Sequence, residues 1–323
     1  MAADVETPGS ATATEGATAS AAAPQWRFFG AVVADVRRIG AHVVRLTLTG
    51  NDLGGFGFAG NDQRIKLLLP HEDDHLGSGP QQLLRSTGPW STCYRALPDG
   101  RRPYLRTYTV RAARPERAEL DLDVVLHDEH AGPASRWAAR AVPGDPVVLL
   151  GPDRQGRGRA WGCEWAPPPT ARTLLLAGDE TAVPAVCAIL EALDPGSRSV
   201  TVLLEVPTTA DVQTLAAADA VAVRWLPRDG CAHGGRLVPA VHAALADLGI
   251  ASALPGQDPE DVDVDRAVLW DVPEHDGAAG CYAWLAGEAG MVKHLRRSLV
   301  RDHGVPRDAV AFMGYWRRGR AEY

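Results

Sequence analysis

The first half of the chain is dominated by short segments in which apolar and polar residues alternate. In residues 42–49 every second side chain from Val44 onward is aliphatic, and residues 120–126 repeat this pattern. Because successive side chains of a strand point to opposite faces, a period of two predicts half-buried antiparallel strands. Composition rich in valine and aromatic residues predicts further strands over residues 26–39, 64–69, 106–111 and 147–150. About six strands, with one short helix over residues 136–141, predict an antiparallel six-stranded β-barrel.

The second half changes to apolar strands that alternate with helices. Strands are expected at residues 174–177, 200–206, 221–226, 282–286 and 310–315. Helices are expected at residues 182–193, 212–218, 237–248 and 288–303. This alternation predicts a doubly wound parallel sheet, so the expected fold is a β-barrel followed by an α/β domain.

Segments without periodicity set the expected domain boundaries. Residues 151–170 are rich in Gly, Pro and Trp and are interpreted as the linker. We therefore expect a barrel domain over residues 25–160 and an α/β domain over residues 161–323. Two polar segments, residues 71–102 and the acidic residues 255–276, lack any period and are expected to be surface loops.

Composition and charge exclude several classes of protein. The 323 residues are enough for two cores, and the net charge of −7 argues against general nucleic-acid binding. No apolar stretch reaches the roughly 18 residues that a membrane-spanning helix needs. Residues 1–24 are rich in Ala, Thr, Ser and Gly and lack the basic and apolar regions of a secretory signal. We expect this segment to be a disordered tail and the protein to be a monomer.

The five cysteines are scattered and form no C-x-x-C pair. A zinc site or a four-cysteine iron–sulfur cluster is therefore not expected, and we expect no metal site. Reduced thiols are the usual state in the cytoplasm, which is the expected location. Any redox chemistry would need a bound organic cofactor.

Residues 106–111 combine a cation, an aromatic ring and hydroxyls within one predicted strand. Arg106 can bind phosphate oxygens, Tyr108 can stack on a flat ring, and Thr109 can form a hydrogen bond. Taken alone, the same pattern fits an amphipathic strand whose charges face water.

Three glycine-rich turns are candidates for binding a nucleotide. Residues 55–60 match G-x-G-x-x-G, but a strand follows where the dinucleotide fingerprint requires a helix, so we reject this motif. Residues 178–181 and 287–290 follow strands of the predicted parallel sheet and precede helices, the usual place for ligands in such sheets. Each contains carboxylates that repel phosphate, so these turns are expected to flank a nicotinamide ribose; ordinary βα turns are the alternative.

The chain resembles the siderophore-interacting proteins, flavin-dependent ferric-siderophore reductases of the ferredoxin-reductase-like superfamily. The resemblance covers most of the chain from Trp26 onward and is carried by six segments in order: residues 62–70, 106–111, His127 with residues 132–138, 177–185, 282–290 and 314–319. The departures are the loops at residues 71–102, 127–130 and 255–276, which affect loop contacts rather than the fold.

The resemblance implies an FAD site with assigned residues. Arg106 would pair with the FAD phosphate, Tyr108 would pack on the flavin, and Thr109 would bond near its reactive nitrogen. The pyrophosphate and adenine side would be held by residues that follow the strand predicted over residues 120–126 and precede the helix predicted over residues 136–141. These residues are His127, Gly132, Ala134 and Ser135. For Ser135, a helix cap is an equal alternative.

The same resemblance implies a nicotinamide side formed by the α/β domain. The residues implied there are Asp179, Glu180, Thr181, Ala182, Gly287 and Glu288. Trp316 would cover the flavin face, or would be a core residue of the last strand. The residues leave NADH, NADPH and reduced ferredoxin open as donors: Arg224 and Arg228 could bind a ribose phosphate, whereas Glu205 lies at the end of the preceding strand.

A ferric siderophore is an anion, so an acidic protein needs a local basic mouth to attract it. The resemblance implies Lys66, with Arg64, Arg111, Arg317 and Arg318 as possible helpers, although each fits an exposed charge equally well. The expected function is FAD-dependent reduction of ferric siderophores with electrons from NAD(P)H or ferredoxin. The alternatives are a flavin reductase serving a quinone or a partner oxygenase, and a non-catalytic flavoprotein that binds a siderophore.

Overall fold

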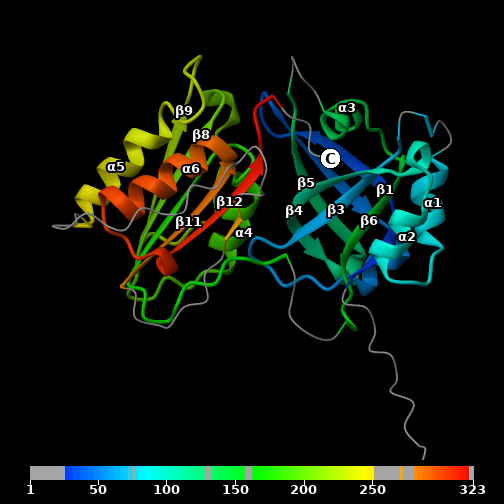
Figure 1. Cartoon of the computed structure of the whole chain (residues 1–323), viewed down its shortest axis with the longest axis horizontal. Helices are drawn as coiled ribbons and strands as arrows, with labels where there is room; N and C mark the ends of the chain where they lie inside the picture. The colour runs from blue at the N-terminus through cyan, green and yellow to red at the C-terminus, as the bar shows by residue number, and fades with distance from the viewer. Residues whose placement is uncertain are drawn as a thin grey trace, which may run out of the picture.

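The computed structural model describes residues 26–71, 73–74, 77–127, 132–156, 162–250, 270–271 and 280–319. Within these ranges the chain forms two bodies that lie side by side. The first half builds a β-barrel, and the second half builds a sheet covered by helices (Figure 1). None of the helices in these ranges is long and apolar enough to cross a membrane.

The barrel closes through antiparallel strands in the order β1-β2-β5-β4-β3-β6, as predicted. The strands are β1 (Trp26–Arg38), β2 (Val43–Thr49), β3 (Arg64–Leu69), β4 (Tyr104–Arg114), β5 (Glu119–Val125) and β6 (Pro146–Pro152). Across β2 and β5, Leu46 faces Leu122 and Leu48 faces Leu120, and all four are buried. The alternation seen in the sequence therefore builds the barrel core, because aliphatic residues of neighbouring strands share the inner face.

Part of the segment expected to be a surface loop forms two short helices on the outside of the barrel. These are α1 (Ser78–Leu84) and α2 (Trp90–Ala96). Leu83 and Leu97 are buried in a small apolar cluster on this side of the barrel. Each helix has only seven residues, and a Gly-Pro pair lies between them, so no helical period accumulates along the sequence. The loop prediction is wrong for this reason.

The second domain contains a sheet in the order β10-β12-β11-β7-β8-β9. Its strands are β7 (Thr173–Gly178), β8 (Ser199–Val206), β9 (Val221–Pro227), β10 (Trp270–Asp271), β11 (Cys281–Glu288) and β12 (Val310–Trp316). Its helices are α4 (Val183–Ala192), α5 (Leu237–Asp247) and α6 (Ala289–Arg297). All the strand pairs except that of β10 with β12 are parallel, which confirms the predicted α/β fold.

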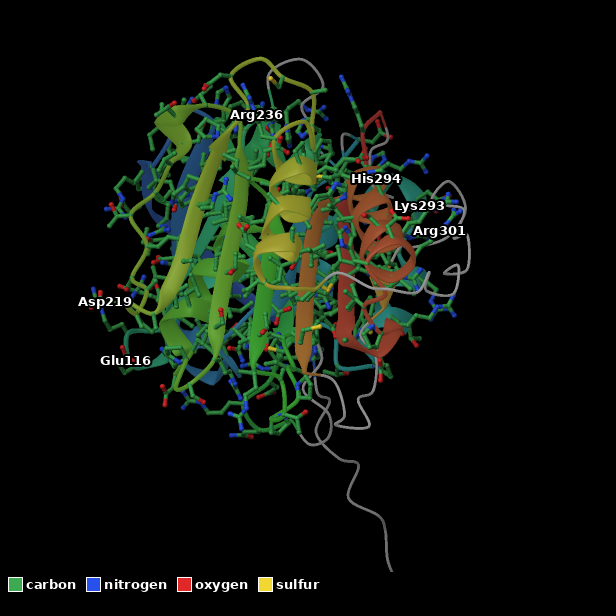
Figure 2. The ribbon with its side chains drawn as sticks, turned by 90° about the vertical axis from the view of Figure 1, so that its left-hand side faces the viewer. Glu116, Asp219, Arg236, Lys293, His294 and Arg301 are labelled. Carbon is green, nitrogen blue, oxygen red and sulfur yellow. The ribbon has the colours of Figure 1, made fainter. Side chains whose placement is uncertain are left out.

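The helices cover both faces of this sheet. Leu245 of α5 and Leu295 of α6 pack in one apolar cluster, and Ile189 of α4 packs in another. Figures 1 and 2 show α5 and α6 on the face away from the barrel and α4 on the face toward it. Lys293 and His294 point outward from α6 (Figure 2). The barrel therefore meets the α4 side of the second domain.

The helix expected over residues 212–218 is not formed. The short 3-10 helix η4 (Thr209–Asp211) precedes this segment, which then runs extended toward β9. Burial alternates along it: Gln213, Leu215 and Ala217 are half-buried and the residues between them are exposed. The chain must return along the sheet to reach the start of β9, and every second residue of this segment packs on the domain as it does so. This packing overrides the helix propensity of the segment.

Two further predictions for the α/β domain need correction. Residues 270–271, within the expected loop 255–276, pair antiparallel with β12 as the edge strand β10. The rest of that expected loop lies outside the described residues, which resume at residue 280. The helix expected over residues 288–303 forms, but its end changes to a π-helical turn, η5 (Ser298–Asp302).

Candidate cofactor site between the two domains

One side of β4 carries a cation and two aromatic rings. Arg106 and Tyr108 pair with Leu67 and Ile65 of β3, so their side chains share one side of the strand. Tyr108 packs against the barrel core and stays partly exposed. The Arg106 guanidinium carbon lies 5.4 Å from the centre of the Tyr104 ring. This side of the strand therefore offers an aromatic platform beside a guanidinium group.

The opposite side of β4 faces the residues expected to contact a siderophore. The Lys66 Nζ donates a hydrogen bond of 2.6 Å to the Thr107 Oγ1, directly across from it on β4. Arg64 forms an ion pair with Glu164 of the segment that links the domains. Lys66 and Arg64 are only partly exposed, and Arg64 is tied to the linker. Lys66 and Arg64 therefore lie on the face of the sheet opposite the side chain of Arg106.

The turn after β5 leads into the short helix α3 (Pro133–Ala138). The helix begins at Pro133 with Gly132 at its N-cap, three residues earlier than predicted, because proline favours the first helical position. Ser135 therefore lies inside the helix and not at its cap. Its buried hydroxyl accepts a hydrogen bond of 2.9 Å from the His127 backbone N–H, and Ala134 packs in the barrel core.

Asp179 joins the ends of three parallel strands at the carboxyl edge of the sheet. Its Oδ1 accepts hydrogen bonds from the Thr181 N–H (2.9 Å) and hydroxyl (2.5 Å). Its Oδ2 accepts from the Glu288 N–H (2.8 Å) and the Trp316 Nε1–H (2.9 Å). Gly287 has φ +141° and a Cβ there would lie 2.6 Å from the Asp179 carboxylate, so the position requires glycine. One carboxylate therefore binds three residues that the sequence analysis assigned to the cofactor site from separate segments: Thr181, Glu288 and Trp316.

The environment of Asp179 favours its protonated form. The side chain is completely buried, and burial, followed by the nearby charge of Glu180, raises its pKa to about 7. The hydrogen bonds from Thr181 and Trp316 act in the opposite direction. Asp179 is thus a carboxyl group that titrates near neutral pH, which neither its residue type nor its sequence neighbours indicate.

Arg228 forms a buried bidentate ion pair with Glu180, with distances of 2.7 and 2.8 Å. This pairing occupies the guanidinium that the sequence offered as a contact for a ribose phosphate. Glu205 of β8 accepts hydrogen bonds from the Gly234 N–H (2.7 Å) and the Arg236 N–H (3.1 Å). Both groups therefore have structural partners at this edge of the sheet.

His233 belongs to this site, and the sequence analysis missed it. Its ring lies 5.0 Å from that of Trp316, and its Nδ1 is buried without a hydrogen-bond partner among the described residues. Burial lowers its pKa. Ligand atoms of His233, Asp179 and Glu180 lie within 4.8 Å of one another, but both carboxylates already accept N–H groups, so we assign no metal to them. The glycine-rich turn after β9 that holds His233, at the carboxyl edge of a parallel strand, was the available signal.

The remaining predicted residues take structural positions around this edge. Glu288 caps α6 by accepting from the Met291 N–H at 2.8 Å. Ala182 is the buried N-cap residue of α4, and Arg317 follows β12 directly. Arg111 lies apart from the group, in an ion pair with Glu191 of α4.

Two contacts bring the barrel and the sheet edge together. The rings of His127, at the end of β5, and Trp316, at the end of β12, lie 5.6 Å apart. Burial raises the pKa of Tyr315, the residue before Trp316, well above its usual range, and the neighbouring Thr109 of β4 acts in the opposite direction. His127 and Thr109 of the barrel therefore lie beside the end of β12, next to the residue whose indole Asp179 holds.

A closed barrel joined to such a sheet defines the class of ferredoxin-reductase-like proteins. A solved ferredoxin reductase of carbazole 1,9a-dioxygenase shares this fold with a TM-score of 0.54 at 17% identity, over 90% of this chain and 70% of that one. The family model described as "Siderophore-interacting FAD-binding domain" matches residues 32–156, and that described as "Siderophore-interacting protein" matches residues 171–319. The chain therefore belongs to the siderophore-interacting protein family.

Named relatives agree with this family. The chain is 30% identical to the NADPH-dependent ferric-chelate reductase of Escherichia coli, over 90% of this chain and 93% of that protein. It is 29% identical to the ferric vibriobactin reductase ViuB of Vibrio cholerae, over 88% and 87% of the two chains. The crystal structure of the siderophore-interacting protein SipS from Aeromonas hydrophila matches with a TM-score of 0.62 at 28% identity, over 92% and 94% of the chains.

The residues present fit FAD. Arg106 supplies a guanidinium for a phosphate, and Tyr108 supplies a partly exposed ring on the same side of β4. At Gly132 an added Cβ would meet nothing within 4 Å, which leaves space beside the turn into α3. An FAD-binding first domain and an oxidoreductase class are thus consistent with the chemistry of the site.

Proposed function

We propose that the protein is an FAD-dependent reductase of ferric siderophores that takes electrons from NAD(P)H or ferredoxin. The observation that carries the proposal is the contact between the domains at Trp316: its indole is held by Asp179 on the sheet edge and lies 5.6 Å from the ring of His127 at the end of β5, in a barrel whose β4 carries Arg106 and Tyr108. The names of the relatives ferric vibriobactin reductase and NADPH-dependent ferric-chelate reductase support the same activity.

Bound FAD would supply the conversion that this chemistry needs, since a flavin accepts a hydride and delivers single electrons. The chain's own residues bind and shield the cofactor. Arg106 would hold a phosphate, and Tyr108 would pack on the ring system. Trp316 would cover the opposite side, with its Nε1–H fixed by Asp179 at 2.9 Å. In this arrangement an aromatic side chain from each domain would lie beside the cofactor and exclude water.

The substrate side requires positive charge because a ferric siderophore is an anion. Lys66 is our candidate, since it lies on the face of the barrel opposite Arg106 and is partly exposed beside Thr107. Arg317 and Arg318, directly after Trp316, are the candidates on the other domain. Release of iron would follow from reduction, because hard oxygen ligands hold Fe(II) less tightly than Fe(III).

An anaerobic assay tests the proposal. The purified protein with FAD is mixed with a ferric siderophore and, in parallel, with NADPH, NADH or reduced ferredoxin, and Fe(II) is followed with a chelator. We expect Fe(II) above the no-protein control with at least one donor. An FAD-loaded protein that produces no excess Fe(II) with any donor would refute the reductase and favour a non-catalytic siderophore-binding flavoprotein. Turnover of a quinone in the same samples, without Fe(II), would indicate a flavin reductase for another acceptor.

Two substitutions separate cofactor binding from substrate binding. Arg106→Ala should weaken FAD binding by about tenfold or more, because a charge-assisted phosphate contact is lost. Lys66→Ala should leave FAD binding intact and raise the KM for the ferric siderophore. Fluorescence titration with FAD and steady-state kinetics measure the two effects.

Arg297→Ala, which removes an exposed arginine of α6, is the matched control and should change neither quantity. Loss of FAD from the Lys66→Ala variant would show that Lys66 is misassigned. Full FAD affinity in the Arg106→Ala variant would show the same for Arg106.

A further inference from the structure

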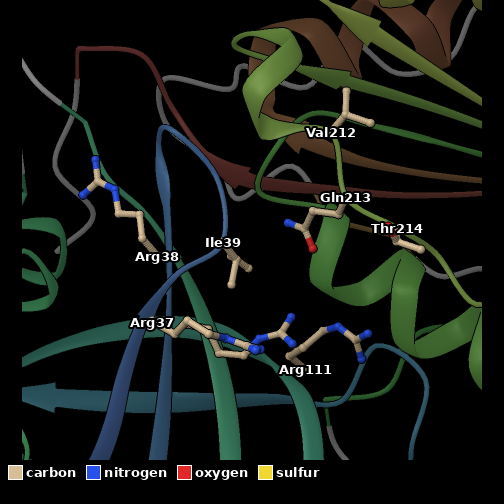
Figure 3. A pocket seen from close by; sticks show the side chains of 8 residues that line it. Arg37, Arg38, Ile39, Arg111, Val212, Gln213 and Thr214 are labelled. Carbon is tan, nitrogen blue, oxygen red and sulfur yellow. The ribbon is translucent and has the colours of Figure 1, made fainter.

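A pocket of about 380 Å³ opens between the barrel and the α/β domain, apart from the residues proposed to hold the cofactor. Arginines from β1, β2 and β4 form one wall, and the extended segment after η4 forms the other (Figure 3). The complete lining is Arg37, Arg38, Ile39, Arg45, Arg111, Val212, Gln213 and Thr214. Four of these residues are cationic and none is acidic, in a protein whose net charge is −7.

Two of the arginines are fixed by carboxylates behind them. Arg45 binds Asp123 through two hydrogen bonds of 2.6 and 2.7 Å, and Arg111 binds Glu191 through two of 2.9 and 2.5 Å. These pairs orient the guanidinium groups and limit their freedom. The side chains of Arg45 and Arg111 are 17% and 13% exposed, so each still has an accessible portion.

The other two arginines form no ion pair with any described residue. Arg38 donates to the Ala41 carbonyl oxygen at 2.7 Å, which neutralises no charge. The side chain of Arg37 has no hydrogen bond or ion pair with any described residue. Among the lining residues and their ion-pair partners, four guanidinium groups therefore stand against the two carboxylates of Asp123 and Glu191.

The backbone of β4 places Arg111 in this pocket. The pairing of β4 with β5 shifts between Val110 and Ala112, so Arg111 is the extra residue of a β-bulge, a device that re-aims a side chain. The Arg111 Nε is buried without a hydrogen-bond partner among the described residues. The hydrogen bond to Asp123 raises the pKa of Arg45, while the charge of Arg111 acts against it, so the two cations repel one another. A cluster of cations that repel one another attracts an anion, because a bound negative charge relieves that repulsion.

The opposite wall adds neutral hydrogen-bonding groups from the α/β domain. Figure 3 shows Gln213 extending toward the space above Arg37 and Arg111. The neighbouring Asp211 is buried and directed toward His42, accepting from its N–H at 2.7 Å and lying 2.8 Å from its Nδ1, and not toward an arginine of the pocket. A ligand in the pocket would therefore contact side chains of both domains.

We propose that this pocket binds a small multivalent anion carrying carboxylate or phosphate groups, and that the bound anion bridges the two domains. Guanidinium forks match both groups geometrically, and several forks in one pocket favour a ligand with more than one anionic group. The proposal does not depend on the reductase activity or on FAD. It also gives Arg111 a role different from contacting the siderophore.

Calorimetric titration of the full-length, FAD-loaded protein tests the proposal. Citrate and pyrophosphate are the two probes, each added at constant ionic strength set with sodium chloride. We expect saturable 1:1 binding of at least one probe, together with a rise in the thermal unfolding temperature. Preference for citrate identifies a polycarboxylate ligand, and preference for pyrophosphate identifies a phosphate ligand. Absence of saturable binding with both probes overturns the proposal.

Variants locate the binding. Arg37→Gln alters an exposed side chain without a described partner, so the fold should be retained, and the affinity should fall by about tenfold. Gln213→Ala should weaken binding from the other wall. Arg297→Gln, on α6, is the charge-matched control and should bind like the wild type. Unchanged affinity in both pocket variants, or an equal loss in the control, overturns the assignment to this pocket.

Discussion

At the scale of single residues, Asp179 organises the candidate site. It receives N–H groups from the turn after β7, from the start of α6 and from the indole of Trp316. These partners come from segments about 109 to 137 residues away in the chain, apart from its neighbour Thr181. A buried carboxyl with this many donors is a positioning residue for Trp316, because it accepts the indole N–H directly and is itself fixed by the other donors.

The raised pKa of Asp179 predicts a pH-dependent stability. Between about pH 4 and about pH 7 the folded carboxyl keeps a proton that the unfolded one has released, so the contribution of Asp179 to stability falls as the pH rises through this window. Above about pH 7 the contribution stays constant. Asp179→Asn cannot titrate and should lack this slope. Urea unfolding at pH 5, 6 and 7.5 gives the free energy of unfolding of each protein, and the slope is the change with pH of the difference between wild type and variant.

Asp219→Asn, an exposed position labelled in Figure 2, should follow the wild type at all three pH values. An identical difference between wild type and Asp179→Asn at pH 5 and pH 7.5 would contradict the raised pKa.

At the scale of elements, short helices depend on side chains outside them. Asp74 precedes α1 and accepts from the Ser78 N–H (2.9 Å), the Ser78 hydroxyl (2.7 Å) and the Gly79 N–H (2.7 Å). These bonds satisfy N–H groups that have no partner within the helix. Burial raises the pKa of Asp74, but the hydrogen bonds from Gly79 and Ser78 outweigh it and hold the pKa below its usual value. A helix of seven residues is formed because of such contacts and its packing rather than its propensity.

Asp74→Ala should destabilise the protein by about 1–2 kcal/mol at pH 7, the usual cost of losing a helix-capping side chain. Because the folded pKa is lowered, the stabilisation is present above about pH 4 and is lost as the pH falls through the folded pKa. The free energies of unfolding of the wild type and the variant should therefore approach one another in acid. Denaturant titrations at pH 7 and pH 3.5 give the two differences.

Asp99→Ala, which removes a carboxylate that is 94% exposed, should cost much less at pH 7. A difference between wild type and Asp74→Ala that persists unchanged at pH 3.5 would contradict the capping role.

At the scale of the whole molecule, Asp62 ties the barrel to the α/β domain. It is fully buried and accepts from the backbone N–H groups of Glu164 (2.9 Å) and Trp165 (3.0 Å) in the linker. It also accepts from the Trp284 Nε1–H of β11 at 3.3 Å. One side chain next to β3 thus holds both the linker and a central strand of the second domain, and this fixes the edge of the sheet beside the barrel.

Asp62→Ala should destabilise the protein by about 3 kcal/mol, because buried donors lose their acceptor. It should also expose the linker, so limited proteolysis between the domains should accelerate. Calorimetry and a protease time course measure the two effects.

Asp62→Asn keeps one acceptor oxygen and should recover part of both losses. If proteolysis of the Asp62→Ala variant were as slow as that of the wild type, Asp62 would have no role in joining the domains.

The strands and the long helices were predictable because burial repeats locally along them. The paired leucines of β2 and β5 carry their period of two in the sequence, and α6 carries a stripe at spacing four. The extended segment 212–218 was not predictable, because its conformation is set by where β9 must begin. The helices α1 and α2 were missed because two turns are too few to display a period.

The sequence by itself determined the two domains, their order and the segments that carry the family resemblance, since all of these are written in local patterns. Only the tertiary structure decided which groups meet. It brought His233 to Trp316, closed the Glu180–Arg228 pair, raised the pKa of Asp179, and gathered arginines of three strands in one pocket. The physical reason is that burial and electrostatic interaction depend on distance in space, and the partners are separated by tens to more than a hundred residues along the chain.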